Sequence, residues 1–282
     1  MPDPLIDTHL HLWDPQHLRY GWLAGNAMLN QRYTLAEFRA ATVMAEVAGA
    51  VFVQCDCAPE QSLAEARWVA QLASEEPRIR GIVARAALER GAAVRDELAE
   101  LVKLPLLRGI RRIIQGEGAG FCAKPDFIAG VQALAEFNFS FDLCLRRDQL
   151  AEATRLVQAC PDVRFVLDHC GNPDVKGKAL EPWLADLTAL ARLPNVVCKL
   201  SGLPTSAGEA WTTADLAPYV DHLLTTFGPT RVLFGGDWPV VLLASSYQRW
   251  ADNARELLAM LAPADRKRVL HDNAVAVYRL TP

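Results

Sequence analysis

The sequence predicts an α/β fold, a single (β/α)8 TIM barrel that spans residues 1–282 and ends in a C-terminal helix. Three observations lead to this prediction. Short runs rich in Val, Ile, Leu or Phe alternate with longer segments of helical periodicity along the whole chain. The 282 residues are 51% hydrophobic, which is enough for one large core. No low-complexity tract, charge block or Gly/Ser linker marks a second domain.

The eight predicted strands show little alternation of apolar and polar residues, as is typical of strands that are buried on both faces. They span residues 5–11, 49–55, 79–84, 107–114, 139–145, 163–169, 196–200 and 232–236. Alternation with helices implies parallel strands joined by right-handed crossovers. An open, doubly wound sheet would satisfy the same order, but closure into a barrel is the commoner solution at this length.

The segments between the strands carry helix signals. Thr34 and Glu37 form the pattern of a capping box, in which a hydroxyl and a carboxylate satisfy free amides at a helix start. Apolar residues recur at helical spacing in the segments 60–73, 148–159, 181–192, 214–227 and 246–261, and residues 263–280 predict one more helix that closes the chain. The segment 14–32 is long for a loop of such a barrel and is interpreted as a lid.

Charge and composition exclude several classes of protein. Lys plus Arg total 29 and Asp plus Glu total 33, a net charge of −4, which argues against a nucleic acid as partner. The longest apolar stretch, residues 40–53, contains Glu46 and Gly49 and is too short to cross a membrane. The N-terminus lacks the basic region of a signal peptide, and seven scattered cysteines do not resemble a disulfide scaffold. We therefore expect a cytoplasmic enzyme that acts on a small molecule, with a homo-oligomeric state left open.

Two histidines end the first predicted strand, at the edge where TIM barrels carry their chemistry. His9 and His11 are two residues apart, so their side chains should point the same way. Neutral imidazoles suit Zn2+, which makes the pair a candidate chelate for one divalent metal. A pair of hydrogen-bonded structural histidines is the alternative.

Two further polar residues end other strands. His169 ends the sixth strand and Asp237 directly follows the eighth. A third imidazole at the same rim favours a catalytic role over a histidine that only satisfies a loop carbonyl. We interpret Asp237 as a general base that also touches a metal, and a loop-capping carboxylate is the alternative.

Four sequence motifs resemble a known family. They occupy residues 7–14 (DTHLHLWD), 167–173 (LDHCGNP), 198–203 (CKLSGL) and 234–239 (FGGDWP). Together they are similar to the amidohydrolase superfamily, in its "amidohydrolase 2" branch of TIM-barrel lactonases. That branch includes L-fuconolactonases and L-rhamnonolactonases, with 2-pyrone-4,6-dicarboxylate lactonases as a more distant relation. The likeness spans the first strand to the eighth and implies hydrolysis of a cyclic ester.

The resemblance also implies a set of site residues. By position it makes His9, His11, His169 and Asp237 the catalytic and metal-binding set. Two-metal members add a carboxylated Lys from strand four and a His from strand five. Residues 107–114 contain no Lys and residues 139–145 contain no His, so a two-metal site is not expected. The resemblance thus implies one divalent metal, preferably Zn2+, or a site that works without metal.

A second set of residues is expected to contact substrate: Arg111, Gln115, Gln54, Lys199, Trp22 and Trp238. Arg111 matches an arginine typical of the branch. Arg112 stands where related sugar lactonases often have a histidine, and it should point away from Arg111 because strand side chains alternate. Indole faces stack on the C–H faces of sugar rings. The alternatives are salt bridges for the arginines, amide networks for the glutamines, charge balance for Lys199 and loop packing for the tryptophans.

Three other features receive structural interpretations. Asp142 is expected to support the site from behind. Cys55 and Cys57 lack the second pair that tetrahedral zinc requires. Cys170 is interpreted as a packing residue, since this hydrolysis needs no thiol nucleophile.

The leading functional hypothesis is hydrolysis of a sugar aldonolactone, of the L-fucono or L-rhamnono type, to the aldonic acid. The imidazoles, with or without a metal, would polarise the ring carbonyl while Asp237 moves the proton. One alternative is a lactonase of an aromatic-acid pathway, acting on a pyrone dicarboxylate or a muconolactone, whose carboxylates Arg108, Arg111 and Arg112 would bind. The other is a barrel that only binds small molecules.

Overall fold

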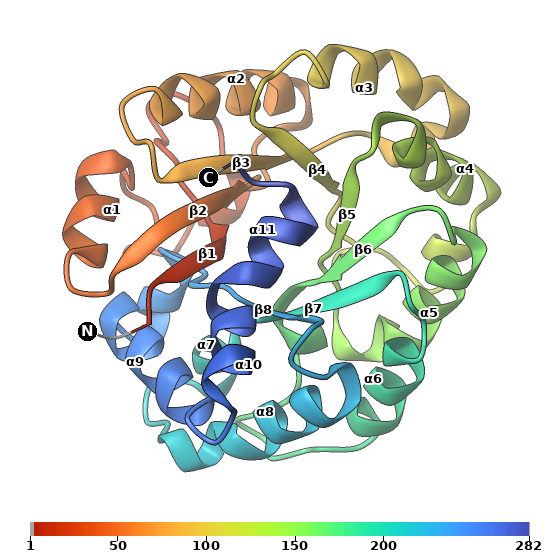
Figure 1. Ribbon diagram of the computed structural model, residues 1–282. Coiled ribbons are helices and arrows are strands. Elements are labelled where there is room, and N and C mark those ends of the chain that lie inside the picture. The colour runs from red at the N-terminus through yellow and green to blue at the C-terminus, as the bar shows by residue number, and fades with distance from the viewer. Residues whose placement is uncertain (1–2, 282) are drawn as a thin grey trace.

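The computed structural model describes residues 3–281 and forms a ring of eight parallel strands in sequence order (Figure 1). The strands are β1 (Leu5–Leu10), β2 (Val47–Val53), β3 (Ile79–Ala84), β4 (Leu107–Arg111), β5 (Ser140–Leu143), β6 (Arg164–Leu167), β7 (Val196–Leu200) and β8 (Val232–Phe234). Helices lie between them and surround the ring. The predicted (β/α)8 TIM barrel with a C-terminal helix is confirmed.

The ring closes between β8 and β1. Leu10 forms a parallel bridge with Trp238. The Asp237 amide donates to the His9 carbonyl at 2.9 Å, and the His11 amide donates to the Trp238 carbonyl at 2.8 Å. This seam therefore brings His9, His11 and Asp237 to one place.

The helices follow the predicted order with some differences. They are α1 (Leu35–Thr42), α2 (Ser62–Ala73), α3 (Arg95–Leu101), α4 (Pro125–Ala133), α5 (Leu150–Ala159), α6 (Trp183–Ala191), α7 (Leu203–Ala207), α8 (Thr213–Phe227), α9 (Tyr247–Leu257), α10 (Pro263–Lys267) and α11 (Asn273–Tyr278). The capping box of α1 is present, with the Thr34 amide donating to Glu37 Oε2 at 2.8 Å. The sequence did not indicate α3, α4 or α7. The predicted helix at 263–280 is interrupted by a π-helical turn, Arg268–Asp272.

Six strands end earlier than predicted, namely β1, β2, β4, β5, β6 and β8. Beyond these ends the backbone leaves the sheet to form the loops. His169 and Asp237 have φ of +53° and +55°, a left-handed conformation that no strand contains. Both predicted site residues thus stand on the first turn after a strand.

The C-terminal helix α11 seals the end of the barrel where the strands begin. Arg164, the first residue of β6, donates to the Val277 carbonyl at 3.0 Å, and Arg279 donates to the Arg108 carbonyl at 2.9 Å. One apolar cluster joins strand residues to α11 and its neighbours: Ile6, Val51, Val53, Val83, Val166, Leu233, Ala274, Val277, Tyr278 and Leu280. Figure 1 shows α11 lying across the ring.

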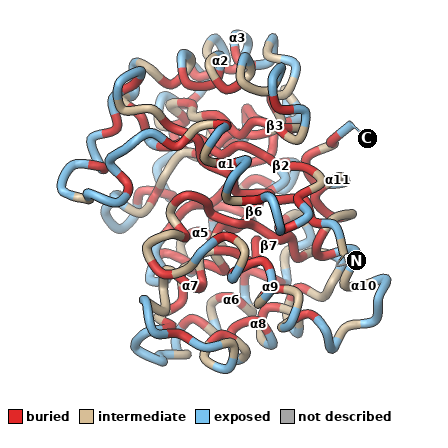
Figure 2. Tube along the Cα trace, turned by 90° about the vertical axis from the view of Figure 1, so that its left-hand side faces the viewer, coloured by how far each residue is buried: buried red, intermediate tan, exposed pale blue. Residues whose placement is uncertain are grey.

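Burial follows this architecture. Figure 2 shows buried positions along the strands and on the inner faces of the helices, with exposed positions on the outside and in the loops. Within residues 3–281, no helix has both the length and the apolar composition needed to cross a membrane.

Candidate active site

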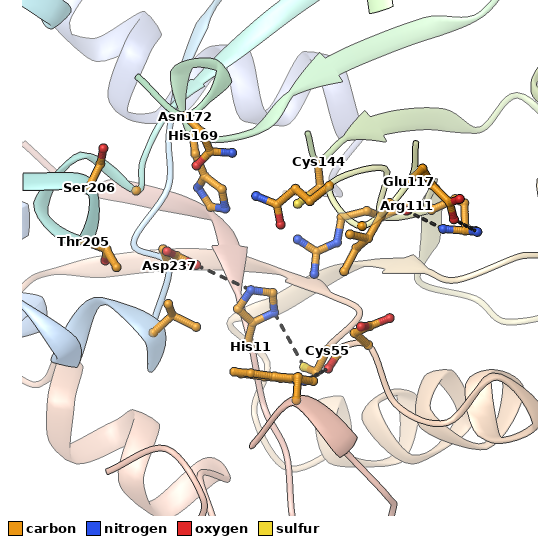
Figure 3. A pocket seen from close by; sticks show the side chains of 18 residues that line it. His11, Cys55, Arg111, Glu117, Cys144, His169, Asn172, Thr205, Ser206 and Asp237 are labelled. Atoms are coloured by element: carbon orange, nitrogen blue, oxygen red, sulfur yellow. Dashed lines mark hydrogen bonds and ion pairs between the residues drawn. The ribbon is translucent and has the colours of Figure 1, made fainter. Parts of the chain in front are cut away.

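A cavity of about 670 Å3 opens at the C-terminal ends of the strands (Figure 3). Six of the predicted site residues line it: His11, Trp22, Arg111, Gln115, His169 and Asp237. They come from several strand ends, as the barrel architecture requires. The predicted lid segment 14–32 contributes Trp22, whose indole N–H donates to the Cys55 carbonyl at 2.7 Å.

His11 presents a free nitrogen to Asp237. Its Nδ1 lies 2.7 Å from the Val53 carbonyl, which can only accept, so Nδ1 carries the proton. Its Nε2 lies 3.5 Å from Asp237 Oδ1. Burial lowers the pKa of His11 to about 3, with Arg111 contributing in the same direction. His11 is therefore a neutral imidazole with its lone pair toward the carboxylate.

His9 lies directly beneath this pair and is fully buried. Its Nδ1 lies 3.3 Å from Asp168 Oδ1, and its Nε2 lies 3.8 Å from Asp237 Oδ1. Burial holds the pKa of His9 well below its ordinary value. Nδ1 faces the acceptor Asp168 and, at 3.2 Å, the Lys199 ammonium. Nε2 faces Arg111 Nη1 at 3.3 Å, which can only donate, so the lone pair of the neutral ring is assigned to Nε2 and the proton to Nδ1.

His169 approaches His9 from the opposite wall, with 4.4 Å between the ring centroids. Its Nδ1 lies 2.9 Å from the Ser201 hydroxyl, which fixes the ring. Gly202 is required beside it, since a Cβ at that position would lie 2.7 Å from the Cβ of His169. Burial also lowers the pKa of His169.

Asp237 and Asp168, the two carboxylates closest to the histidines, have pKa values shifted in opposite directions. Burial raises its pKa to about 6, although the nearby His169 and Arg111 act in the opposite direction. By contrast, Lys199, His9 and Arg111 hold the pKa of Asp168 well below its usual range, against the effect of burial. The two carboxylates thus differ in character: Asp168 stays ionised, and Asp237 can exchange a proton near neutral pH.

Asp7 fixes the seam on which these residues stand, a role that the sequence did not indicate. Its Oδ1 accepts from the His9 amide at 2.8 Å and from the Gly236 amide at 2.7 Å. Its Oδ2 accepts from the Tyr247 hydroxyl at 3.0 Å. One buried carboxylate therefore ties the backbone before Asp237 to the backbone of His9.

Two groups of side chains have the composition and spacing of a metal site. One contains His9, His11 and Asp237, and the other contains His9, Asp168 and His169; within each group the ligand atoms lie within 4.8 Å of one another. Imidazole nitrogens with carboxylate oxygens suit a divalent transition metal. The Nε2 atoms of His11, whose proton is on Nδ1, and of His9, which faces the Arg111 donor, carry no proton, so the donor set fits one such ion. Asp168 was not predicted as a ligand. Among residues 3–281, the Cys55–Cys57 pair belongs to no such group.

Three residues predicted to bind substrate do not line the cavity. Lys199 is fully buried below it and pairs with Asp142 at 2.6 Å and with Asp168 at 2.9 Å. Gln54 is fully buried, and its Oε1 accepts from the Asp56 amide at 2.5 Å. The Trp238 ring is 1% exposed and packs on Tyr33 and Phe38. Their positions fit the alternative interpretations, which are charge balance for Lys199, an amide network for Gln54 and loop packing for Trp238.

Arg111 and Arg112 both border the cavity. Arg111 reaches the site as predicted, with Nη1 3.4 Å from Asp168 Oδ2 and 3.3 Å from His9 Nε2. Arg112, which was predicted to point away from Arg111, also borders the cavity, directly after the end of β4 at Arg111. Arg112 pairs with Glu89 at 3.1 Å and with Glu117 at 2.5 Å.

A family model described as Amidohydrolase matches residues 6–280, and the chain belongs to this family. Among characterised relatives, an L-fucono-1,5-lactonase of Burkholderia multivorans is 32% identical over 98% of this chain and 96% of that protein. An L-rhamnono-gamma-lactonase of Scheffersomyces stipitis is 20% identical over 98% of both chains.

Solved structures show the same relationship. An amidohydrolase of Burkholderia multivorans with bound zinc matches with a TM-score of 0.88 and 31% identity, over 99% of this chain and 100% of that one. A probable 2-pyrone-4,6-dicarboxylic acid hydrolase of Acinetobacter baumannii matches with a TM-score of 0.80 but only 16% identity, over 98% of this chain and 99% of that one. The second likeness concerns the fold alone.

Proposed function

We propose that the protein hydrolyses a sugar aldonolactone, of the L-fucono or L-rhamnono type, to the corresponding aldonic acid. The observation that carries the proposal is the facing pair of Asp237 and neutral His11 in the cavity wall, 3.5 Å apart. The full-length similarity to an L-fucono-1,5-lactonase supports the same substrate class.

In this proposal Asp237 accepts a proton from the attacking water and later returns it. The carboxylate accepts a proton as the water oxygen bonds to the ring carbonyl carbon. It returns that proton to the ring oxygen as the carbon–oxygen bond of the ester breaks, which leaves a hydroxy acid. Without a bound metal, a pKa of about 6 suits both steps, because the group is mostly ionised at neutral pH yet remains a usable acid once protonated.

The cofactor of the proposed reaction is one divalent metal, with Zn2+ preferred. His9, His11 and Asp237 would hold it, with His169 on the adjoining side. When bound, the ion would supply Lewis-acid polarisation of the ester carbonyl. His11 is suited to this because the Val53 carbonyl holds its ring proton on Nδ1, and His9 because the Arg111 donor beside Nε2 leaves the lone pair on that atom.

Substrate orientation is assigned to Trp22, Arg111 and Gln115. The Trp22 N–H is engaged by the Cys55 carbonyl, and its side chain is 40% exposed, so it offers an aromatic face rather than a donor. Such a face suits the C–H face of a sugar ring. Gln115 and Arg111 supply hydrogen bonds for the oxygen atoms of the lactone.

A pyrone dicarboxylate is the second candidate, and the presence of Arg112 in the cavity wall favours it. However, Arg112 already faces two carboxylates, Glu89 and Glu117. Arg111 alone would leave one anion of a dianionic ligand uncompensated, which is costly in a buried site. The neutral sugar lactone is therefore preferred.

The test is a panel of lactones assayed for acid release at neutral pH with purified protein. The wild-type protein is expected to hydrolyse six-carbon and 6-deoxy aldonolactones faster than the Asp237→Asn variant does. A protein that binds these lactones without turnover would be a binding module instead. Cytoplasmic location remains a prediction, with which the seven free, buried cysteines agree.

A further inference from the structure

A chain of buried polar side chains connects the C-terminal helix to the candidate site. It starts at the Tyr278 hydroxyl, which donates to Asp142 Oδ2 at 2.7 Å. Asp142 pairs with Lys199 at 2.6 Å, and Lys199 pairs with Asp168 at 2.9 Å. Asp168 in turn lies 3.3 Å from His9 Nδ1. All five side chains are fully buried, so solvent replaces none of these contacts.

The lysine is shared between two carboxylates. Its ammonium group lies within ion-pair distance of both Asp142 and Asp168, and 3.2 Å from His9 Nδ1. Asp168 Oδ1 lies 2.9 Å from the ammonium nitrogen and 3.3 Å from His9 Nδ1, so a carboxylate acceptor and an ammonium donor both face that ring nitrogen. The position of Lys199 between the carboxylates therefore affects how Asp168 holds the imidazole.

Tyr278 contacts Asp142, the second carboxylate partner of Lys199. It gives Asp142 a neutral donor in addition to Lys199. Without the hydroxyl, Asp142 would depend more strongly on Lys199 and draw the ammonium group away from Asp168. Removing one member of a buried network shifts the remaining bonds, because no water can compensate.

We propose that Tyr278 is a positioning residue for the hydrolytic reaction. It acts through Asp142 and Lys199 on Asp168, and so fixes the tautomer and orientation of His9. The C-terminal helix would then serve the site as well as seal the barrel. This inference rests on the proposed function for its kinetic consequence, but its structural consequence at His9 can be measured without substrate.

The test is Tyr278→Phe, which keeps the aromatic ring and removes the hydroxyl. The helix has other anchors, since Asn273 donates to the carbonyls of Pro229 at 2.8 Å and Val232 at 2.7 Å. Tyr219→Phe is the control: Tyr219 of α8 is also buried, donates to the Asp174 carbonyl at 3.2 Å, and is outside the network.

Two measurements are made on each variant. Steady-state kinetics on the best lactone of the panel should show kcat lowered about tenfold in Tyr278→Phe with KM within about twofold, as expected when an outer partner of a site histidine is lost. Nitrogen-15 NMR of the imidazoles should show changed ring shifts for His9, which is assigned by a His9→Gln variant. Tyr219→Phe should match the wild type in both.

A double-mutant cycle tests the route. If Tyr278 acts through Asp142, then Tyr278→Phe should lower kcat less than about twofold in an Asp142→Asn background. Full additivity of the two changes would overturn this route.

The outcomes separate the two proposals. Unchanged His9 shifts in Tyr278→Phe would overturn the positioning role, whatever the kinetics. Changed shifts with kcat within twofold of wild type would overturn its catalytic importance. A wild-type protein that is inactive on every lactone would refute the proposed function, while the NMR comparison would still decide whether Tyr278 positions His9.

Discussion

Asp237 Oδ1 lies 3.5 Å from His11 Nε2, so a carboxylate that follows the last strand faces an imidazole that follows the first. The backbone seam between these strands sets that distance, through hydrogen bonds of the Asp237 and His11 amides across it. Burial makes the imidazole neutral and makes the carboxylate a weak acid. The pair thus combines a free lone pair with a group able to exchange a proton.

Replacing Asp237 by Asn should abolish most of the activity. The amide keeps the shape of the side chain but cannot accept the proton of water, so kcat should fall by about 100-fold or more. Steady-state kinetics measure the loss, and circular dichroism checks that the fold is retained. Activity within about threefold of wild type would remove Asp237 from the mechanism.

A His9→Ala/His11→Ala double variant should lose both bound metal and activity, because it removes two of the three ligands in one candidate group. Elemental analysis and kinetics are the measurements, with His17→Ala as a control that changes an exposed histidine. If metal removal leaves the wild type fully active while either single variant is inactive, the histidines act directly on the carbonyl and the zinc mechanism is wrong.

Substrate preference should follow the free charges of the cavity. Because Arg112 is paired with Glu89 and Glu117, we expect kcat/KM for 2-pyrone-4,6-dicarboxylate to be at least about tenfold below that for six-carbon or 6-deoxy aldonolactones. The comparison is made at neutral pH with both substrates. The reverse order would mean that Arg112 exchanges its partners for substrate carboxylates.

Glu65 predicts a pH dependence of stability. This carboxylate of α2 is 1% exposed, and burial raises its pKa from 4.5 to about 7, although its bond from the Cys55 amide opposes the shift. The folded state therefore binds a proton more tightly than the unfolded state, and the free energy of unfolding should fall as the pH rises from 4.5 through 7. The loss is at most about 3 kcal/mol.

The Glu65→Gln variant should lack this dependence, since the amide does not titrate. Urea unfolding at about pH 5 and pH 8 should show that the variant gains stability relative to wild type at the higher pH. Glu75→Gln, at an exposed position, should show no such gain. An equal difference between Glu65→Gln and wild type at both pH values would contradict the burial argument.

Much of the site could be predicted because four of its residues stand where apolar runs end. Alternation along a strand does not predict which neighbours reach the cavity where a strand ends. It places neighbours on opposite faces, yet Arg112 and Arg111 both reach the cavity, and Asp168 and His169 both reach the site. β4 stops between the two arginines, whereas β6 stops at Leu167, just before Asp168, and the left-handed backbone of His169 turns the chain.

The sequence patterns also did not predict how deeply each side chain is buried relative to the cavity. Lys199, Gln54 and Trp238 occupy or closely follow strand ends, as predicted, but they lie beneath or beside the cavity because their partners come from distant segments. The partners of Lys199 come from β5 and from the turn after β6. Asp7 likewise acquires its role only from the Gly236 amide and the Tyr247 hydroxyl.

The Asp7–Gly236 hydrogen bond joins residues 229 positions apart, which has a consequence for folding. Contacts between such distant segments close a large loop and form slowly. An intermediate in which β1 to β7 are paired would already give nearly all of the far-ultraviolet circular dichroism of the native protein. In this intermediate, His9 would not yet face Asp237. During refolding, enzymatic activity should therefore return with the slowest phase and lag behind the far-ultraviolet circular dichroism.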